Sequence, residues 1–241
     1  MKFIFILLFC LAGLLAYYGF NFYQKFSVAQ KLIAKAEPYE LKTGSVGKTM
    51  LVLGDSTAVG VGADGPQDTV PALLSSKIGL SIVDNQAVSG ARVFDIDAQA
   101  SRAPEDSYDL LLVMIGANDI IRFASADDAA ATLKSSLAKL PPHEQLVVVL
   151  SAGNVGGTKL FPWFVRPFHS KLNQKYHQTF SKVVEEVGGE YVNLYEDPRS
   201  DPFVKEPDQY LAKDGLHPTS LGYGVWLTKI LEQTDLLPKG D

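Results

Sequence analysis

Cysteine is almost absent from this sequence: Cys10 is the only one among 241 residues, and it lies inside an apolar run. A disulfide within the chain is therefore excluded, and so is a zinc site built on cysteines. Histidine is also scarce, and the four are His143, His169, His177 and His217. They show neither the i, i+4 spacing around a glutamate that marks a zinc-protease helix nor a His-x-His pair. We therefore expect no metal and no other cofactor.

The chain also lacks a basic run and a stripe of basic and aromatic residues. With 22 lysines and arginines against 27 aspartates and glutamates, its net charge is −5. These features do not match the patterns of nucleic-acid-binding proteins, and we expect no nucleic-acid partner. Hydrophobic residues make up 46% of the chain, which is enough apolar material for one large domain or two small ones.

Charge is missing from the N-terminal segment, where no charged residue occurs from Phe3 to Gln24. About 20 apolar residues in a helix cover the roughly 30 Å hydrocarbon core of a bilayer, so this run is long enough for a transmembrane anchor. A cleaved signal peptide is the alternative, but it would have a shorter apolar core and small residues before the cleavage site. The run instead ends in aromatic residues typical of a membrane interface, namely Tyr17, Tyr18, Phe20, Phe22 and Tyr23. We favour an uncleaved anchor.

The charges that flank this run leave its orientation open. Basic residues lie on both sides of it, namely Lys2 before it and Lys25, Lys31 and Lys35 after it. The positive-inside rule alone mildly favours a cytoplasmic domain, but an export-type N-terminus is the commoner case. We therefore expect a membrane-anchored or exported cell-envelope protein whose domain lies outside the cytoplasm. Residues 1–23 would be the anchor or signal peptide, residues 24–48 a stalk, and residues 49–241 the folded domain.

The pattern of the remaining chain alternates between strands and helices. Apolar strand patterns occur at Met50–Leu53, Ser81–Asp84, Leu110–Ile115, Leu146–Leu150 and Tyr191–Leu194. Helical patterns lie between them at Val70–Ile78, Ala126–Leu140 and Phe168–Val187, and a last one follows at Leu221–Leu231. This alternation predicts a three-layer α/β/α domain with a five-stranded parallel sheet. His169 and His177 belong to the third helical pattern, and we expect both to be solvated.

Four polar stretches follow strands or precede the last helix. They are Gly54-Asp55-Ser56, the Asn85–Ala91 stretch with Gly90, Gly116-Ala117-Asn118-Asp119, and Asp214-Gly215-Leu216-His217-Pro218. Because parallel strands all exit at the same edge of a sheet, the first three stretches should gather on one rim, where ligands bind in open α/β sheets. The alternative is that all four are turns and helix caps without a chemical role. Asp55 and Asp119 are expected to fix loops rather than to act as catalysts.

The residues of these stretches match the needs of a serine nucleophile. A serine hydroxyl needs a base within hydrogen-bond reach, and histidine suits this task at neutral pH. We therefore predict Ser56 as nucleophile, His217 as base and Asp214 as the carboxylate that orients the imidazole. Acyl transfer also needs donors for an oxyanion. The backbone N–H groups of Ser56 and Gly90 and the side-chain amide of Asn118 are the candidates.

These four stretches resemble the sequence blocks of the SGNH, or GDSL-type, serine hydrolase superfamily, in order and in spacing. The resemblance covers roughly residues 49–236, and its one departure is Thr57, where the commonest motif has leucine. It implies a flavodoxin-like α/β/α fold with a serine–histidine–aspartate triad and a three-donor oxyanion hole. It implies these roles for Ser56, Gly90, Asn118, Asp214 and His217 alone.

One further stretch bears on the substrate. A loop follows the strand pattern at Leu146–Leu150 and carries Phe161, Trp163 and Phe164. These aromatic residues would wall an acyl pocket, because ligand sites are mostly apolar. The alternative is that they pack on the core beneath the loop.

The sequence therefore predicts a carboxylic ester hydrolase that acts through an acyl-enzyme on a small-molecule or lipid ester. An acyl esterase, lysophospholipase or thioesterase fits the aromatic loop and the anchor best. The alternatives are a cell-envelope carbohydrate O-acetylesterase and a non-catalytic binding module on the same scaffold. The same residues would also support acyl transfer.

Overall fold

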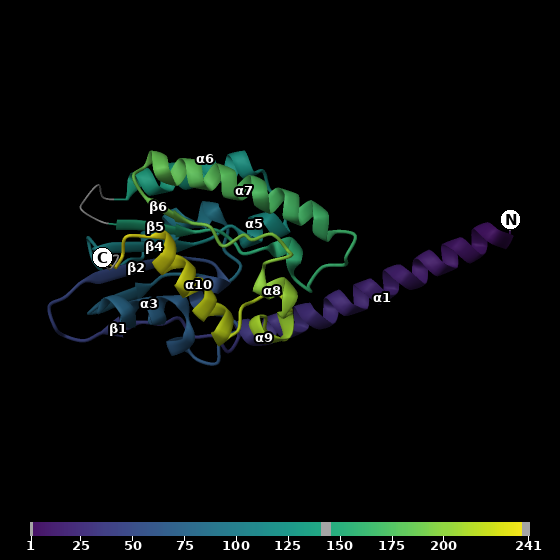
Figure 1. The fold of residues 1–241 in the computed structure, drawn as a ribbon, viewed down its shortest axis with the longest axis horizontal. Coiled ribbons are helices and arrows are strands. Elements are labelled where there is room, and N and C mark those ends of the chain that lie inside the picture. Colours follow the sequence, from purple (N-terminus) through teal and green to yellow (C-terminus); the bar gives the residue numbers. More distant parts are fainter. Residues whose placement is uncertain (1, 141–145, 238–241) are drawn as a thin grey trace.

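A mixed sheet of six strands forms the centre of the molecule (Figure 1). The computed structural model describes residues 2–140 and 146–237, so His143 lies outside the described part. The strands are β1 (Leu41–Lys42), β2 (Thr49–Gly54), β3 (Ile82–Asn85), β4 (Leu110–Met114), β5 (Leu146–Leu150) and β6 (Glu190–Val192). Their order in the sheet is β1-β3-β2-β4-β5-β6.

Five of these strands are parallel, as the sequence predicts. Their order is that of a flavodoxin-like doubly wound sheet. The second parallel strand, β3, is added on one side of β2, and the later strands β4, β5 and β6 are added on the other side. The sixth strand, β1, pairs antiparallel with β3 at the edge of the sheet and corrects the expected number of five. It has only two residues, which is too short for a recognisable alternating pattern.

Helices cover both faces of the sheet (Figure 1). The longer helices of the domain are α3 (Val70–Ile78), α6 (Ala126–Lys139), α7 (Arg166–Glu186) and α10 (Ser220–Gln233). The short ones are α2 (Ser56–Val59), α4 (Ile96–Ala100), α5 (Ala117–Ile121), α8 (Pro202–Lys205) and α9 (Pro207–Tyr210). One apolar core lies between the sheet and α4, α6 and α7, and the other lies between the sheet and α3 and α10. This is the predicted three-layer arrangement.

The register of the sheet determines which loops meet. Gly54, the last residue of β2, pairs with Met114, the last residue of β4. The loops that carry Ser56 and Asn118 therefore leave neighbouring strands at the same edge of the sheet. This is the carboxyl edge at the point where strand order reverses, and ligand sites of open α/β sheets lie there.

One histidine of α7 differs from its expected environment. His169 is only 1% exposed, and its ring lies between those of Phe123 and Phe161, at centroid distances of 4.4 and 4.2 Å. The expectation of a solvated His169 was wrong, because the loop before α7 folds back over this end of the helix. His177 is half-buried beside Tyr191.

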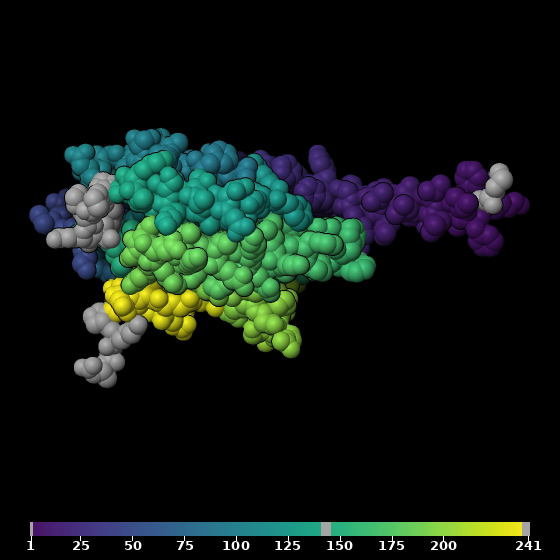
Figure 2. Space-filling view, turned by 90° about the horizontal axis from the view of Figure 1, so that it is seen from above, coloured from purple at the N-terminus to yellow at the C-terminus, as the bar shows by residue number. Residues whose placement is uncertain are grey.

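A single helix, α1 (Lys2–Ile33), leads into the domain and projects far from it (Figures 1 and 2). Its first part is exposed and apolar, with a mean hydropathy of 2.3 over the most apolar window. Its last turns pack on the domain, where Ala29 is buried. The segment 24–48, expected to be a stalk, therefore contains the end of α1 and the edge strand β1.

Candidate active site

Ser56 stands at a sharp turn from β2 into α2. Gly54 has a φ of +148°, and a Cβ at this position would lie 2.1 Å from the Met114 carbonyl oxygen. Only glycine allows β2 to approach β4 this closely before the chain turns. The buried side chain of Gln99 holds the same residue from both sides, because it accepts from the Gly54 N–H (2.7 Å) and donates to the Gly54 carbonyl (2.8 Å). The turn that presents Ser56 is therefore fixed by its neighbours.

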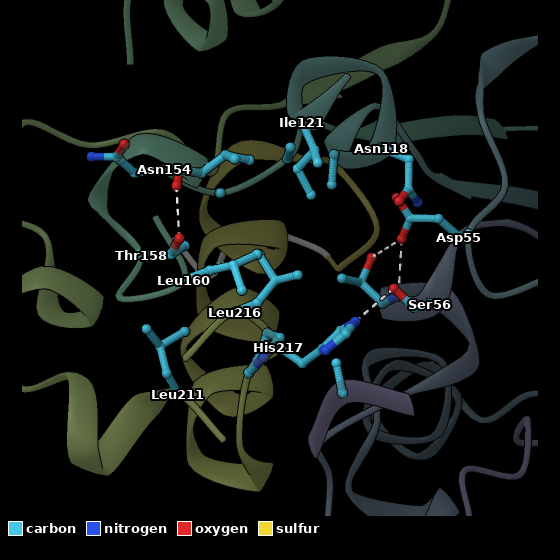
Figure 3. A pocket seen from close by; sticks show the side chains of 18 of the residues that line it. Asp55, Ser56, Asn118, Ile121, Asn154, Thr158, Leu160, Leu211, Leu216 and His217 are labelled. Atoms are coloured by element: carbon cyan, nitrogen blue, oxygen red, sulfur yellow. Dashed lines mark hydrogen bonds between the residues drawn. The ribbon is translucent and has the colours of Figure 1, made fainter. Parts of the chain in front are cut away.

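The Ser56 hydroxyl contacts the imidazole of His217, which the chain brings from 161 residues away. The distance from Ser56 Oγ to His217 Nε2 is 2.8 Å (Figure 3). On the other side of the ring, His217 Nδ1 lies 2.5 Å from Asp214 Oδ2. All three side chains are buried, with 8% of Ser56, 4% of His217 and none of Asp214 exposed. The structure thus brings the three predicted residues into one hydrogen-bonded series.

The Asp214 carboxylate is held in place by the backbone of the residues that follow it. Its Oδ1 accepts hydrogen bonds from the N–H groups of Leu216 (3.0 Å) and His217 (3.1 Å), while Oδ2 faces the ring. Burial alone would raise the pKa of Asp214, but the hydrogen bonds and the charge of His217 hold this pKa below its usual value. Asp214 therefore stays ionised and fixes the Nδ1–H tautomer of His217.

The three predicted oxyanion donors line the same cavity as the Ser56 hydroxyl. The side-chain amide of Asn118 donates to the Ala91 carbonyl at 3.0 Å. A primary amide has two N–H groups, so this bond orients the group and leaves the second donor for a ligand. The Ser56 N–H opens α2 and has no acceptor within its own helix. Gly90 adopts a left-handed φ of +87°.

Two buried carboxylates hold the loops around this site. Asp119 accepts hydrogen bonds from Arg92 Nε (3.0 Å) and from the Val93 N–H (3.1 Å), which ties the loop after Gly90 to α5. Asp55 caps α2 by accepting from the N–H (2.9 Å) and the hydroxyl (2.8 Å) of Thr57. Both contacts are those of loop-fixing residues, in line with the sequence-based interpretation.

The burial of Asp55 leads to a prediction about stability. Burial raises the pKa of Asp55 from 3.8 to about 6, so the folded protein binds its proton more tightly than the unfolded chain. The stability of the folded state therefore decreases as pH rises from about 4 to above 6. With about 1.4 kcal/mol for each pKa unit, the ionised carboxylate costs about 3 kcal/mol at pH 8.

Asp55→Asn should remove most of this cost. Both contacts with Thr57 use the single oxygen Oδ1, which an asparagine retains. Placing the new N–H₂ group should cost about 1 kcal/mol. We therefore expect the free energy of unfolding of the variant to exceed that of wild type by about 2 kcal/mol at pH 8, and this gain should disappear at pH 4. Chemical unfolding of the two proteins at both pH values, in the same neutral detergent, measures this difference. A difference that is independent of pH would contradict the assignment.

An apolar cavity of about 380 Å³ extends from Ser56 (Figure 3). Its walls include Leu160, Leu211, Leu216 and Trp226 from the domain. A second wall comes from α1, which contributes Phe22, Phe26, Ala29, Gln30 and Ile33. The volume lies in the range of small-molecule sites and suits an apolar group attached to the reacting carbonyl.

The aromatic residues predicted to wall this cavity lie elsewhere. Phe161, Trp163 and Phe164 are absent from its lining. Phe164 instead packs against Tyr18 of α1 at a centroid distance of 5.3 Å, and Phe161 lies 6.5 Å from Phe22. The end of α1 forms the wall that the prediction gave to the loop. Phe161 packs against the core, as the alternative expected, whereas Trp163 is largely exposed.

Sequence reasoning missed the wall that α1 provides. The signal was nevertheless present, since the apolar lining residues Phe22, Phe26, Ala29 and Ile33 recur at intervals of four, three and four along the helix. This spacing places them on one face. It was hidden because the preceding residues are apolar on every face. Gln99 was missed as well, because a lone glutamine in a short helix has no distinctive pattern.

The fold and the hydrogen bonds between Ser56, His217 and Asp214 are those of serine hydrolases with a flavodoxin-like sheet. The model of the GDSL-like lipase/acylhydrolase family matches residues 52–225. The chain therefore belongs to this family and is a carboxylic ester hydrolase, as the resemblance of its sequence blocks implied.

Solved structures with the same fold come from enzymes with different substrates. Phospholipase A1 from Streptomyces albidoflavus NA297 is 20% identical, with a TM-score of 0.60 over 78% of this chain and 100% of its own. The acetylxylan esterase Axe2 from Geobacillus stearothermophilus is 19% identical, with a TM-score of 0.59 over 83% and 100%. TesA is 19% identical, with a TM-score of 0.60 over 79% and 100%. A comparison with curated proteins found no match. At these identities the likeness shows the fold alone.

Proposed function

We propose that this protein hydrolyses acyl esters through an acyl-enzyme formed on Ser56. The observation that carries the proposal is the contact between Ser56 Oγ and His217 Nε2 at 2.8 Å, at the end of an apolar cavity. The cavity is where the acyl chain of a carboxylic ester would lie, with its carbonyl carbon next to the hydroxyl. A lysophospholipase, medium-chain esterase or thioesterase activity fits this arrangement.

In the first half of the reaction, the Ser56 oxygen attacks the carbonyl carbon while His217 Nε2 takes the hydroxyl proton. The Nδ1–H of the ring donates to Asp214, which stabilises the imidazolium that forms. His217 then gives the proton to the leaving oxygen or sulfur, and the acyl group remains on Ser56. In the second half, His217 removes a proton from water as the water attacks the acyl-enzyme, and it then gives this proton to Ser56 Oγ as the bond to the acyl group breaks and the carboxylic acid leaves.

Negative charge develops on the carbonyl oxygen in both halves. The donors that would face it are the N–H groups of Ser56 and Gly90 and the free N–H of the Asn118 amide. Asn118→Ala should therefore lower kcat by about 10²-fold and leave KM nearly unchanged, since the contact forms fully only in the transition state. Steady-state hydrolysis of p-nitrophenyl butyrate measures both constants. A tenfold rise of KM at constant kcat would show that Asn118 binds the substrate instead.

The length of the acyl chain separates the proposed activity from the alternative of a carbohydrate O-acetylesterase. The alternative is retained because Axe2, an acetylxylan esterase, shares the fold. We expect kcat/KM for p-nitrophenyl esters to rise from the acetate to medium chains, because each buried methylene contributes about 0.8 kcal/mol. Strict preference for the acetate would support the O-acetylesterase instead.

A fluorophosphonate probe tests the nucleophile independently of the substrate. Such a probe should label Ser56 covalently in the wild-type protein. If the protein remains unlabelled and inactive towards every ester, the domain is a binding module on a hydrolase scaffold.

We further propose that residues 1–23 anchor the protein in a membrane with residues 49–241 outside the cytoplasm. The exposed apolar part of α1 supports an anchor, since none of its most apolar window is buried in the domain. Protease treatment of intact spheroplasts tests the orientation. If the domain is digested only after lysis, it lies in the cytoplasm, contrary to the proposed orientation.

A further inference from the structure

A second hollow, of about 190 Å³, lies between α1 and the loop that precedes α7. Its lining includes Tyr17 and Tyr18 of α1 and Trp163 of the loop. Three cationic residues also line it: Lys25 from α1, Lys159 from the loop and Arg166 at the start of α7. We call these three residues the basic cluster. Figure 1 shows the loop before α7 running from the start of that helix towards α1.

The positive charge of the basic cluster is only partly balanced by the protein. Lys159 Nζ pairs with Asp208 at 2.7 Å, but the Asp208 side chain is 94% exposed. Lys25 Nζ and Arg166 Nε donate to backbone carbonyls, those of Lys159 and Phe161. In residues 2–140 and 146–237, neither forms an ion pair with a carboxylate. Burial, and then the neighbouring charges of Arg166 and Lys159, lower the pKa of Lys25. An anion in the hollow would relieve this repulsion.

The position along α1 places the basic cluster at the level of lipid headgroups. The apolar run of α1 ends at Phe20, and Lys25 follows five residues later. At 1.5 Å for each residue this is about 7 Å along the axis. The headgroup layer extends about 5–8 Å beyond the hydrocarbon core on each side. The Trp163 side chain is 70% exposed in the same region, as expected for an aromatic residue at a membrane interface.

The hollow adjoins the Ser56 cavity, because Leu160 lines both, and Phe22 and Phe26 of the cavity wall stand close to Lys25 in the sequence of α1. The basic cluster therefore lies on the side of the cavity that α1 and the Leu160 loop form.

We propose that the basic cluster binds the phosphate of an anionic membrane lipid whose acyl ester enters the Ser56 cavity. The inference rests on the proposed function, since it names the class of ester that this hydrolase takes. Lys25 and Arg166 supply the charge, because Lys159 is shared with Asp208. The substrate is then a single-chain phospholipid with a net negative headgroup. It is drawn from the bilayer in which α1 lies.

The test compares two substrates with the same acyl ester, one with and one without an anionic phosphoglycerol headgroup. The full-length protein hydrolyses 1-palmitoyl-lysophosphatidylglycerol or 1-palmitoylglycerol in nonionic detergent micelles, which carry no surface charge of their own. In the double variant Lys25→Gln/Arg166→Gln, we expect KM for the lysophospholipid to rise at least tenfold, with kcat within about threefold of wild type. The constants for 1-palmitoylglycerol should stay within twofold.

Two controls keep the result specific to the basic cluster. Lys31→Gln removes an exposed cation of the same helix that lines neither cavity. It should leave kcat and KM unchanged for both substrates. Lys25→Arg/Arg166→Lys keeps both charges and should restore most of the lost affinity. Hydrolysis of p-nitrophenyl butyrate reports the catalytic residues. If that activity is absent in wild type, the proposed function has failed rather than this inference.

Inorganic phosphate distinguishes a lipid headgroup from the free anion. We expect 10 mM phosphate to inhibit lysophospholipid hydrolysis at most weakly, because the acyl chain supplies most of the affinity, and this inhibition should be absent in the double variant. The proposal is overturned if the double variant affects both substrates alike or neither. It is also overturned if inorganic phosphate inhibits wild type and double variant measurably and to the same extent, because the anion would then bind elsewhere.

Discussion

Ser56→Ala should lower kcat for p-nitrophenyl esters by about 10⁴- to 10⁶-fold, the largest loss we expect from any single substitution in this chain. The alanine removes the only atom that can form the acyl-enzyme, while the oxyanion donors and the cavity remain. KM should therefore change little. Stopped-flow or long-time absorbance assays measure the residual rate, and the fluorophosphonate label should disappear at the same time.

Two comparisons make this result interpretable. Ser101→Ala, at an exposed position after α4, should have the kcat of wild type. This control shows that the loss in Ser56→Ala does not arise from the purification of a serine-to-alanine variant. Thermal unfolding should show Ser56→Ala to be folded. Activity within tenfold of wild type would mean that another residue is the nucleophile.

Asp214→Asn should lower kcat by about 10⁴-fold although it changes a residue that never touches the substrate. The asparagine can keep its oxygen towards the N–H groups of Leu216 and His217, so the local backbone is preserved. Its amide would then face His217 Nδ1 as a donor. The ring would take the opposite tautomer, with the proton on Nε2, and could no longer accept the proton of Ser56.

The measurement is kcat with p-nitrophenyl butyrate, with Asp106→Asn at an exposed position as the matched control. The double variant Ser56→Ala/Asp214→Asn should be no slower than Ser56→Ala, because residues that act as a unit do not contribute additively. A further large loss in the double variant would give Asp214 a role outside the series formed with His217 and Ser56.

The site could be predicted from sequence because its geometry follows from topology and short spacings. Parallel strands deliver Ser56 and Asn118 to one edge, and the register of Gly54 with Met114 makes their loops neighbours. Asp214 and His217 lie three residues apart, which is close enough for one turn of backbone to bring carboxylate and ring together. Such features need no knowledge of distant packing.

The walls of the cavity could not be predicted in this way. They depend on where the end of α1 packs on the domain. Because most of α1 is apolar on every face, hydrophobic periodicity does not predict which face contacts the domain. The misplacement of Phe161, Trp163 and Phe164 follows from the same omission. The amphipathic pattern of α7 predicts a solvated His169, whereas a loop from outside the helix covers it.

In the proposed function, the unbroken course of α1 makes membrane anchoring and substrate selection depend on one and the same stretch of backbone. A water-soluble form made by deleting residues 1–34 would also lose Phe22, Phe26, Ala29 and Ile33 from the cavity wall. Leu160 and Trp226 would then face water, and such a form would be an altered enzyme with broader and weaker discrimination between esters. Natural selection on chain-length preference would likewise act on the helix that we propose as the membrane anchor.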